Sequence, residues 1–481
     1  MSFLFFPKWV RIFLIPLCLA GLPIGCLAAD QVQPVVVTVT DDGKGASLVP
    51  QFLGLSYESS MLLPQNGLYY FDAHNTALVN TFKTLGIKSL RVGANAVDDP
   101  RIPVPQEKDI DSLFAFARAA GVKVIYSFRL KDGDPKDSAR LARYIADHHG
   151  DALDCFAVGN EPNLFLKPYE VFFAQWKTHY DAILKAVPDA KFDGPSDVGA
   201  RYVLNLARDV FAEGHLAMVS DHNYFLGSGR VGETNPPATR ARFLSNDVHK
   251  KYERSYDKLG AVLASNGIPY RMDELNSCYY GGAKDSSDTY AAALWALDCT
   301  HWWAAHHLIG MNYHTGESVG RDGTFGAAHY AAFVRRADGS GFDIRPQSYA
   351  YLAFSQGAKG RPLEVDTQAP ELFNFNTYAY QDRDGSLYVT LINKSYGDNA
   401  QTALVSLQLP PGKSFGGCQR LALVQEHQDV AAKTGVKLGG AAISPQGKWA
   451  GQWKKFKVGD QRNPTFRVEP ASAIMLCFAP K

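Results

Sequence analysis

Two glutamates in this chain stand where a pair of carboxylates could act together on one substrate. Glu161 follows a short apolar run at 155–159, and Glu274 ends a second run at 270–274. Two carboxyl groups on either side of a sugar can break a glycosidic bond. One protonates the departing oxygen, and the other attacks the anomeric carbon or activates water. The two runs lie far apart in the sequence, so this chemistry requires a fold that brings their ends together.

Each glutamate also has a purely structural interpretation. Glu161 precedes Pro162, and a carboxylate next to a proline is favourable at a helix N-terminus. Glu274 could form an ion pair with Arg271. The amide of Asn160 favours the catalytic interpretation, because an amide beside the acid can bond a sugar hydroxyl, and that bond strengthens in the transition state. We therefore predict that Glu161 and Glu274 form a catalytic pair.

The elements that must position these glutamates repeat along the chain as short β-rich runs separated by longer amphipathic stretches. This alternation predicts βα units and a parallel sheet. Eight such runs favour a closed (β/α)8 barrel, an α/β fold whose active sites lie at the carboxyl ends of the strands. The runs are 52–57, 89–93, 123–128, 155–159, 190–194, 218–225, 270–274 and 308–314.

A region of different character follows the predicted barrel. After about residue 350, strand-like runs alternate with Gly, Asp and Asn turns, which is typical of an antiparallel β-sandwich. A further run at 34–40 could complete that sandwich as an outer strand. The expected organisation is a signal peptide (1–29), an N-terminal strand joining the sandwich (30–50), a catalytic barrel (51–350) and a C-terminal β-sandwich domain (351–481). The sandwich runs are 373–380, 387–392, 403–409, 418–424 and 473–478.

The first thirty residues predict export. A positively charged start precedes an apolar stretch at 12–27 that ends in Ala28 and Ala29, the pattern of a cleaved secretory signal. Prolines interrupt the stretch, whereas a spanning helix needs about 20 apolar residues. We expect a secreted or periplasmic protein, cleaved near Ala29 and without a membrane span. Lipid attachment at Cys26 is the alternative.

Composition and missing motifs exclude several classes of function. The chain has 49 Lys and Arg against 48 Asp and Glu, a net charge of +1, so it lacks the strongly basic character of nucleic-acid binders. No G-x-S-x-G motif and no phosphate-binding glycine loop is present. One basic run at 453–457 (WKKFK) could bind an anionic polysaccharide or could guard a sandwich edge against aggregation.

The cysteines and histidines give no metal or redox pattern. No C-x-x-C or H-E-x-x-H spacing occurs, so we expect buried cysteines, core or rim histidines, no metal and no cofactor. A Cys278–Cys299 or a Cys418–Cys477 disulfide remains open in an oxidising compartment. The cysteines beyond the leader are Cys155, Cys278, Cys299, Cys418 and Cys477.

These motifs resemble glycoside hydrolase family 79, the heparanase and β-glucuronidase family, in the clan of retaining (β/α)8 glycosidases. The resemblance covers nearly the whole chain after the leader. In the clan, an Asn-Glu pair on strand four carries the acid/base and a Glu ending strand seven is the nucleophile. The family then shows a Tyr-Gly-Gly element and a Ser-Asp-Thr helix start. The matching motifs are Tyr279-Tyr280-Gly281-Gly282, Ser287-Asp288-Thr289, Leu90-Arg91-Val92-Gly93, His222-Asn223-Tyr224 and Asn312-Tyr313-His314.

The resemblance implies roles for single residues. Glu161 would be the general acid/base and Glu274 the nucleophile of a double displacement with retention. The Tyr-Gly-Gly loop would bind the carboxylate of glucuronic acid, because glycines let backbone N–H groups approach an anion and a tyrosine hydroxyl adds a donor. This chain has two tyrosines before its glycines, so either Tyr279, Tyr280 and Gly281 or Tyr280, Gly281 and Gly282 match the family.

Further rim residues complete the implied site. Asn160 would bond a sugar hydroxyl, Tyr224 and Tyr313 could hold the nucleophile or the sugar, and Glu58 and Asn95 could bind sugar hydroxyls. Packing at the barrel rim is the alternative role for the last four.

The expected activity is that of a monomeric, retaining β-glucuronidase acting on oligosaccharides, polysaccharides or glycoconjugates that contain glucuronic acid. A clan relative that cleaves neutral β-glycosides and a carbohydrate-binding protein without catalysis are the alternatives. Nucleic acid is not an expected partner.

Overall fold

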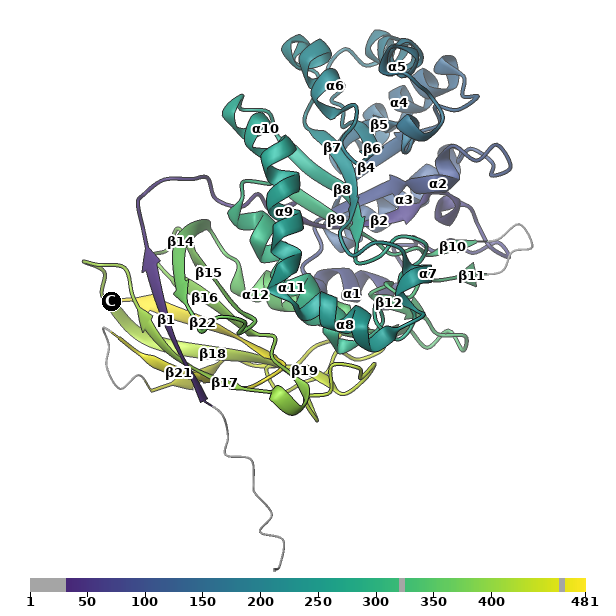
Figure 1. Cartoon of the computed structure of the whole chain (residues 1–481). Coiled ribbons are helices and arrows are strands. Elements are labelled where there is room, and N and C mark those ends of the chain that lie inside the picture. Colours follow the sequence, from purple (N-terminus) through teal and green to yellow (C-terminus); the bar gives the residue numbers. More distant parts are fainter. Residues whose placement is uncertain (1–31, 320–324, 458–462) are drawn as a thin grey trace, which may run out of the picture.

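The computed structural model describes residues 32–319, 325–457 and 463–481. Figure 1 shows a barrel ringed by helices, coloured purple to teal, beside a domain of strands coloured green to yellow. Ala29 and Cys26, the predicted cleavage and lipid-attachment residues, lie outside the described residues. Within the described ranges, no helix is long and apolar enough to cross a membrane.

Eight parallel strands form the barrel, in the order β5-β4-β3-β2-β9-β8-β7-β6. An isolated bridge between Phe156 and Phe192, and a hydrogen bond from the Glu161 N–H to the Ser196 carbonyl (2.8 Å), close the seam between β5 and β6. The predicted (β/α)8 barrel is therefore confirmed. The strands are β2 (Leu53–Glu58), β3 (Ser89–Gly93), β4 (Lys123–Phe128), β5 (Leu153–Val158), β6 (Pro195–Val198), β7 (Val219–Tyr224), β8 (Tyr270–Asn276) and β9 (Gly310–His314).

The fifth barrel strand differs from its prediction. The sequence pattern favoured 190–194, but β6 covers Pro195–Val198 and pairs with β7 from Pro195 onward. In the earlier run, Phe192 makes single bridges and packs its ring against Trp176 and Tyr180 of α5 (Tyr169–Ala186). The apolar pattern thus identified the segment that packs against the helix, and the segment that extends the ladder follows it.

Helices cover the outside of the barrel. Helix α1 shows why they begin and end where they do: the Asn75 side chain accepts the Leu78 N–H at its start, and Gly86 ends it at φ 73°, a left-handed conformation that glycine adopts without strain. The main helices are α1 (Thr76–Leu85), α3 (Glu107–Ala120), α4 (Pro135–His149), α5 (Tyr169–Ala186), α6 (Val203–Val210), α8 (Pro236–Leu244), α9 (His249–Ser255), α10 (Ala261–Ser265), α11 (Tyr290–Ala305) and α12 (Pro346–Gly357).

The second domain is one continuous order of strands, β19-β18-β22-β16-β15-β14-β1-β17-β21, with β20 added beside β18. β1 (Val32–Thr40) joins it from the N-terminal end of the described chain, as predicted, and Val35, Val37 and Val39 enter its core. The other strands are β14 (Arg361–Gln368), β15 (Phe375–Gln381), β16 (Leu387–Asn393), β17 (Thr402–Gln408), β18 (Phe415–Gln425), β19 (Val436–Leu438), β20 (Lys454–Phe456), β21 (Thr465–Val468) and β22 (Ser472–Pro480).

One pairing in this domain departs from the antiparallel prediction. β1 runs parallel to β17 and antiparallel to β14. Because the whole barrel separates β1 from these strands in the sequence, no hairpin turn fixes its direction. The domain boundary near residue 350 stays a proposal, since α12 packs both on α11 of the barrel and on β22 of the sandwich.

The two disulfides left open by the sequence do not form, and all five described cysteines are free thiols. Cys418 pairs across the ladder with Phe478 and joins the sandwich core, whereas its neighbour Cys477 packs on the other face of β22. Cys278 and Cys299 are each buried. The cysteines therefore serve as small core residues.

A buried ion pair links the barrel to the sandwich. The Lys394 ammonium, directly after β16, donates to Asp298 of α11 at 2.7 Å, and both side chains are fully buried. The Tyr378 hydroxyl donates to the same carboxylate at 2.7 Å. Burial by itself would raise the pKa of Asp298, but Lys394 and His249 outweigh it and hold that pKa below its usual range.

Replacing Asp298 by alanine should lower the free energy of unfolding by about 3–5 kcal/mol, because it leaves the Lys394 ammonium buried without a partner. Denaturant unfolding near neutral pH measures this loss. Since the folded pKa of Asp298 lies below the unfolded value of about 3.9, the stabilisation is present above that pH and fades as the pH falls further. The double variant Asp298→Leu/Lys394→Met is the control and should recover most of the loss. A loss below about 1 kcal/mol in the single variant would contradict this account.

Candidate active site

The two predicted glutamates meet at the carboxyl-terminal mouth of the barrel. Glu161 follows β5 and Glu274 lies near the end of β8. One carboxylate oxygen of each, together with a ring nitrogen of His222, lie within 4.8 Å of one another. Retaining glycosidases hold their carboxyl groups about 5–5.5 Å apart, and inverting enzymes about 6.5–9.5 Å apart. So close an approach of single oxygens favours the retaining range over the inverting one.

The local backbone geometry directs the Glu161 side chain toward the mouth of the barrel. Glu161 adopts a left-handed conformation, with φ 46°, between the end of β5 and a short 3-10 helix at Pro162–Leu164. Such a conformation costs a residue other than glycine on the order of 1–3 kcal/mol, so the surrounding structure holds this carboxylate in place. Its side chain is 17% exposed, against 4% for Glu274, so Glu161 is the carboxylate that solvent and a leaving group can reach.

A bulge in β8 turns two consecutive acids toward the barrel interior. Opposite β7, Asp221 pairs with Met272 and the next residue, His222, pairs with Glu274, so Asp273 is the extra residue. The ladder to β9 shifts in the same place. Side chains alternate faces along a regular strand, and a bulge breaks that alternation. Asp273 and Glu274 can therefore both contact groups inside the barrel.

Glu274 is held as an anion by direct hydrogen bonds. Arg91 Nη1 donates to Glu274 Oε2 at 2.8 Å, and the Tyr224 hydroxyl donates to Oε1 at 2.8 Å. Burial by itself would raise the pKa of Glu274, but His314, His222 and Arg91 outweigh it and lower that pKa. Arg91 Nη2 also donates to the Asn160 amide oxygen at 2.8 Å, which links Glu274 to the residue before Glu161.

His222 links the acid/base candidate to a buried carboxylate. Its Nδ1 lies 3.0 Å from Glu161 Oε1, and its Nε2 lies 3.5 Å from Asp273 Oδ1. Burial opposes a charge on this ring, yet Glu274, Asp273 and the bond to Glu161 outweigh it and raise the pKa of His222. A protonated imidazole has no lone pair for a metal. The cluster of Glu161, His222 and Glu274 therefore suits proton transfer better than metal binding.

Several functional side chains had no role assigned from the sequence. Arg91, His222 and His314 lie inside the quoted motifs, but the pattern did not tell which face of a strand they occupy. His314 Nδ1 lies 3.9 Å from Glu274 Oε2, and its Nε2 lies 3.7 Å from Glu58 Oε1. Tyr330 lies in no motif. It packs 6.2 Å from the Tyr224 ring and 6.0 Å from the His314 ring.

The prediction for Tyr313 is wrong. Its side chain is fully buried on the outer face of β9, where its hydroxyl lies 2.8 Å from Thr300 Oγ1 of α11 and donates to the Ala296 carbonyl at 3.3 Å. Because faces alternate along β9, it is the next residue, His314, that reaches the interior beside Glu274.

Glu58 and Asn95 lie beside the catalytic pair. Glu58 Oε2 accepts the Ala96 N–H at 2.7 Å, and Asn95 accepts a 3.4 Å bond from the Asn160 amide. Asn95, Asn160 and Glu161 line a pocket of about 440 Å³. This pocket is lined by Glu161 and not by Glu274, which places Asn95 on the Glu161 side of the site. Their sugar-binding role stays a prediction.

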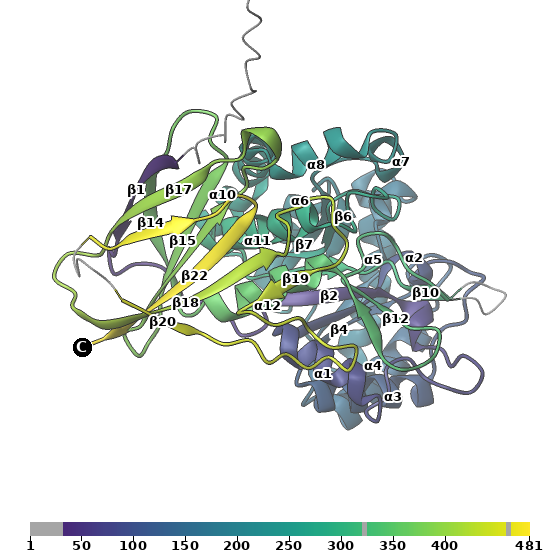
Figure 2. The same cartoon turned by 90° about the horizontal axis from the view of Figure 1, so that it is seen from below.

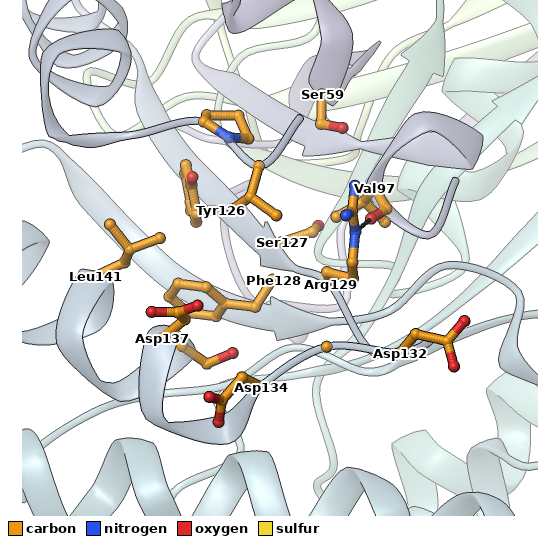
Figure 3. A pocket seen from close by; sticks show the side chains of 14 residues that line it. Ser59, Val97, Tyr126, Ser127, Phe128, Arg129, Asp132, Asp134, Asp137 and Leu141 are labelled. Carbon is orange, nitrogen blue, oxygen red and sulfur yellow. Dashed lines mark hydrogen bonds between the residues drawn. The ribbon is translucent and has the colours of Figure 1, made fainter. Parts of the chain in front are cut away.

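The loop that carries Asn160 is anchored by Asp98, whose own segment is held by Arg129. The Asn160 N–H donates to Asp98 at 2.8 Å. Arg129, after β4, donates to the carbonyls of Val97, Asp99 and Ile102 and thereby fixes the segment that contains Asp98. Figure 3 shows Arg129 directed toward Val97, at a pocket that Tyr126 and Phe128 also line. The volume of this pocket is about 170 Å³.

The Tyr-Gly-Gly loop is a turn of left-handed residues. Tyr280, Gly281 and Gly282 follow one another with φ of 61°, 79° and 81°. The Tyr280 ring is 63% exposed, and the guanidinium of Arg230 lies 4.4 Å from its centre. A Cβ on Gly282 would lie 3.0 Å from Tyr330, so the loop borders the surroundings of Glu274 through that ring.

No family model matches the chain, but curated relatives do. It is 26% identical to rat heparanase (Rattus norvegicus) over 330 residues, which are 63% of this chain and 56% of the relative. It is 25% identical to a β-glucuronidase of Aspergillus niger over 231 residues, 41% of each chain. Heparanase of Gallus gallus is 25% identical over 69% of this chain and 64% of its own length. The chain thus spans about half of the length of the first relatives it matches.

Solved structures share the fold over nearly the whole chain. A 4-O-α-L-rhamnosyl-β-D-glucuronidase from Fusarium oxysporum superposes with a TM-score of 0.68 at 17% identity, covering 92% of this chain and 99% of that one. A GH51 arabinofuranosidase from Xanthomonas axonopodis gives 0.66 at 16% identity, covering 93% and 100%. The chain is therefore similar in sequence to heparanases and a β-glucuronidase, and it shares its fold with these solved structures.

Proposed function

We propose that this chain is an exported, retaining β-glucuronidase. The observation that supports the proposal most is the pair of glutamates at the spacing for retention, one held anionic and the other reachable from solvent. The relatives named heparanase and β-glucuronidase favour glucuronic acid as the sugar. A β-linked glucuronide of a glycan or glycoconjugate is the proposed substrate.

The geometry supports a double displacement. Glu274 attacks the anomeric carbon while Glu161 gives its proton to the departing oxygen, which leaves a covalent glycosyl-enzyme. Arg91 and Tyr224 orient the attacking carboxylate through the bonds described above. Esterification of Glu274 removes its negative charge from the site. Glu161 then takes a proton from water, and that water releases the sugar with retained configuration.

The carboxylate of the sugar is proposed to lie against the Tyr-Gly-Gly loop. Gly281 and Gly282 allow close approach of an anion to the backbone, and their φ values of 79° and 81° disfavour any side chain. Tyr330 and Tyr224 lie between this loop and Glu274. In this arrangement the loop would bind the carboxylate of the sugar while the anomeric carbon faces Glu274.

Substitution of Gly282 by alanine tests the proposal. The new Cβ would lie 2.9 Å from Ser287 and 3.0 Å from Tyr330, in a strained left-handed conformation. We expect wild type to cleave a 4-nitrophenyl β-glucuronide far faster than the matching β-glucoside. The variant should lower the ratio of the two kcat/KM values by about 10–100-fold, the worth of one or two hydrogen bonds to a charged group.

Gly267→Ala is the matched control. Gly267 has φ 66° and open space around its Cβ position, in the turn before β8 and away from the mouth, so it tests backbone strain alone and should leave the ratio within about threefold. Wild type that prefers the glucoside would keep the catalytic pair and reject glucuronic acid. Inactivity on both substrates would favour a carbohydrate-binding protein.

A further inference from the structure

A basic pocket opens on the sandwich, away from the barrel mouth. Its volume is about 360 Å³, and it lies between β18, β20 and the turn at 439–440. In Figure 2, β18 and β20 lie beside the C-terminus, at the opposite end of the molecule from α2 (Ala94–Val97) and β10 (Ser318–Val319) next to the mouth. The lining residues are Arg420, Ala422, Gly439, Gly440, Gln452, Lys454, Lys455 and Phe456.

Two cations on one face of this pocket have no acidic partner. Arg420 stands opposite Lys454 in the β18–β20 ladder, so their side chains share a face, whereas Lys455 points to the other face of β20. Within the described ranges, no carboxylate forms an ion pair with Arg420 or Lys454, and no acidic residue lines the pocket. Two other lysines of the same domain do have partners, since Lys413 pairs with Asp41 and Lys437 with Glu426. Among the described residues, the positive charge of Arg420 and Lys454 is therefore uncompensated.

The remaining walls add an amide and an open side. Gln452 offers an amide, and Phe456 packs its half-buried ring against Phe466 of the sandwich core and so supports the pocket from below the strand. A Cβ on Gly440 would meet nothing within 4 Å, so that wall is open. Trp453 anchors the start of β20, because its indole N–H donates to the Gln356 side chain at 3.4 Å. Cations beside an amide are groups that bind an acidic saccharide.

Protection of a sheet edge explains only part of this arrangement. β20 pairs with β18 alone among the described strands, and lysines on such an edge discourage association with other sheets. That role requires charge on the edge strand. It requires neither a hollow nor Arg420, which lies on β18 between β20 and β22.

We propose that this pocket binds an acidic polysaccharide through its carboxylate or sulfate groups. The site would tether the protein to the polymer while the distant barrel acts on a glycosidic bond, and tethering of this kind raises the effective concentration of substrate. The inference goes beyond the proposed activity and does not depend on which sugar the barrel accepts.

The test measures polymer binding by variants of the full chain made inactive by Glu274→Gln. Arg420→Gln/Lys454→Gln removes two pocket charges, and Lys413→Gln/Lys437→Gln removes two charges of the same domain outside the pocket. Calorimetry at about 0.15 M salt uses polygalacturonate as the carboxylate probe, dextran sulfate as the sulfate probe and neutral dextran as the blank.

We expect the pocket variant to bind at least one anionic polymer about tenfold more weakly or worse, and the control variant to stay within about twofold of the parent. The polymer that shows the loss identifies carboxylate or sulfate as the ligand. In the active protein, which keeps Glu274, the same Arg420 and Lys454 substitutions should leave kcat/KM on a small aryl glycoside unchanged. Three results would overturn the inference. They are equal losses of affinity in the pocket and control variants, unchanged affinity in the pocket variant, and a parent protein that binds neither anionic polymer. Loss of glucuronide cleavage alone would reject only the proposed activity.

Discussion

Glu274→Gln is expected to lower kcat on an aryl β-glucuronide by about 10⁴–10⁶-fold, the scale seen when an enzyme loses its nucleophile. The amide keeps the shape of the side chain, and its oxygen can still accept the hydrogen bond from the Tyr224 hydroxyl, but it cannot form the covalent glycosyl-enzyme. Steady-state kinetics with purified protein measures the loss. Substrate binding should remain, because the Tyr-Gly-Gly loop is untouched.

Two controls separate lost chemistry from lost structure. Glu233→Gln changes an exposed glutamate after α7 (Gly229–Gly232) and should retain wild-type kcat. Glu274→Gly should regain activity with sodium azide, since azide can enter the space left by the carboxylate and yield an α-glycosyl azide. Residual activity of Glu274→Gln within about 100-fold of wild type would reject Glu274 as the nucleophile.

Glu161→Ala is the second large effect, and its size should depend on the leaving group. General acid catalysis contributes about 10²–10⁴-fold, so a glycan substrate should lose at least that much. A 4-nitrophenol leaving group needs little protonation, so the first step survives and the covalent intermediate accumulates as a burst.

Azide distinguishes this residue from the nucleophile. With Glu161 removed, azide should attack the intermediate and give a β-glucuronosyl azide, the opposite anomer from the Glu274→Gly product. His222→Gln is an informative neighbour, since the His222 ring lies 3.0 Å from Glu161, and this substitution should lower kcat/KM on the glycan without abolishing activity. Equal losses on the glycan and on the nitrophenyl substrate would contradict the role of Glu161.

Periodic features were the most predictable from the sequence. Seven of the eight barrel strands lie within a few residues of their apolar runs, because a strand buried on both faces is a continuous apolar run. The fifth was displaced because Phe192 of the earlier run packs against α5, which gave that run the stronger apolar signal. The parallel β1–β17 pairing joins segments far apart in the chain, and no local pattern encodes it.

The sequence motifs predicted which segments form the site. They did not predict which side chains of those strands face the barrel interior. Gly-Asn-Glu-Pro and the strand-ending Glu placed Glu161 and Glu274 on one rim, which is where they lie. Tyr313 was predicted to reach the site and His314 reaches it instead, because a one-residue step along β9 changes the face. The bulge at Asp273 likewise puts two consecutive acids inside, and only the ladder register reveals it.

The most direct test of the account is the configuration of the first product. Wild type is mixed with an aryl β-glucuronide, and the anomeric proton is followed by NMR before the sugar mutarotates. Because the two carboxylates approach within 4.8 Å, the account predicts that β-glucuronic acid forms first and the α-anomer grows in afterwards. Initial release of the α-anomer would contradict the double displacement, and failure to cleave any β-glucuronide would contradict the proposed substrate.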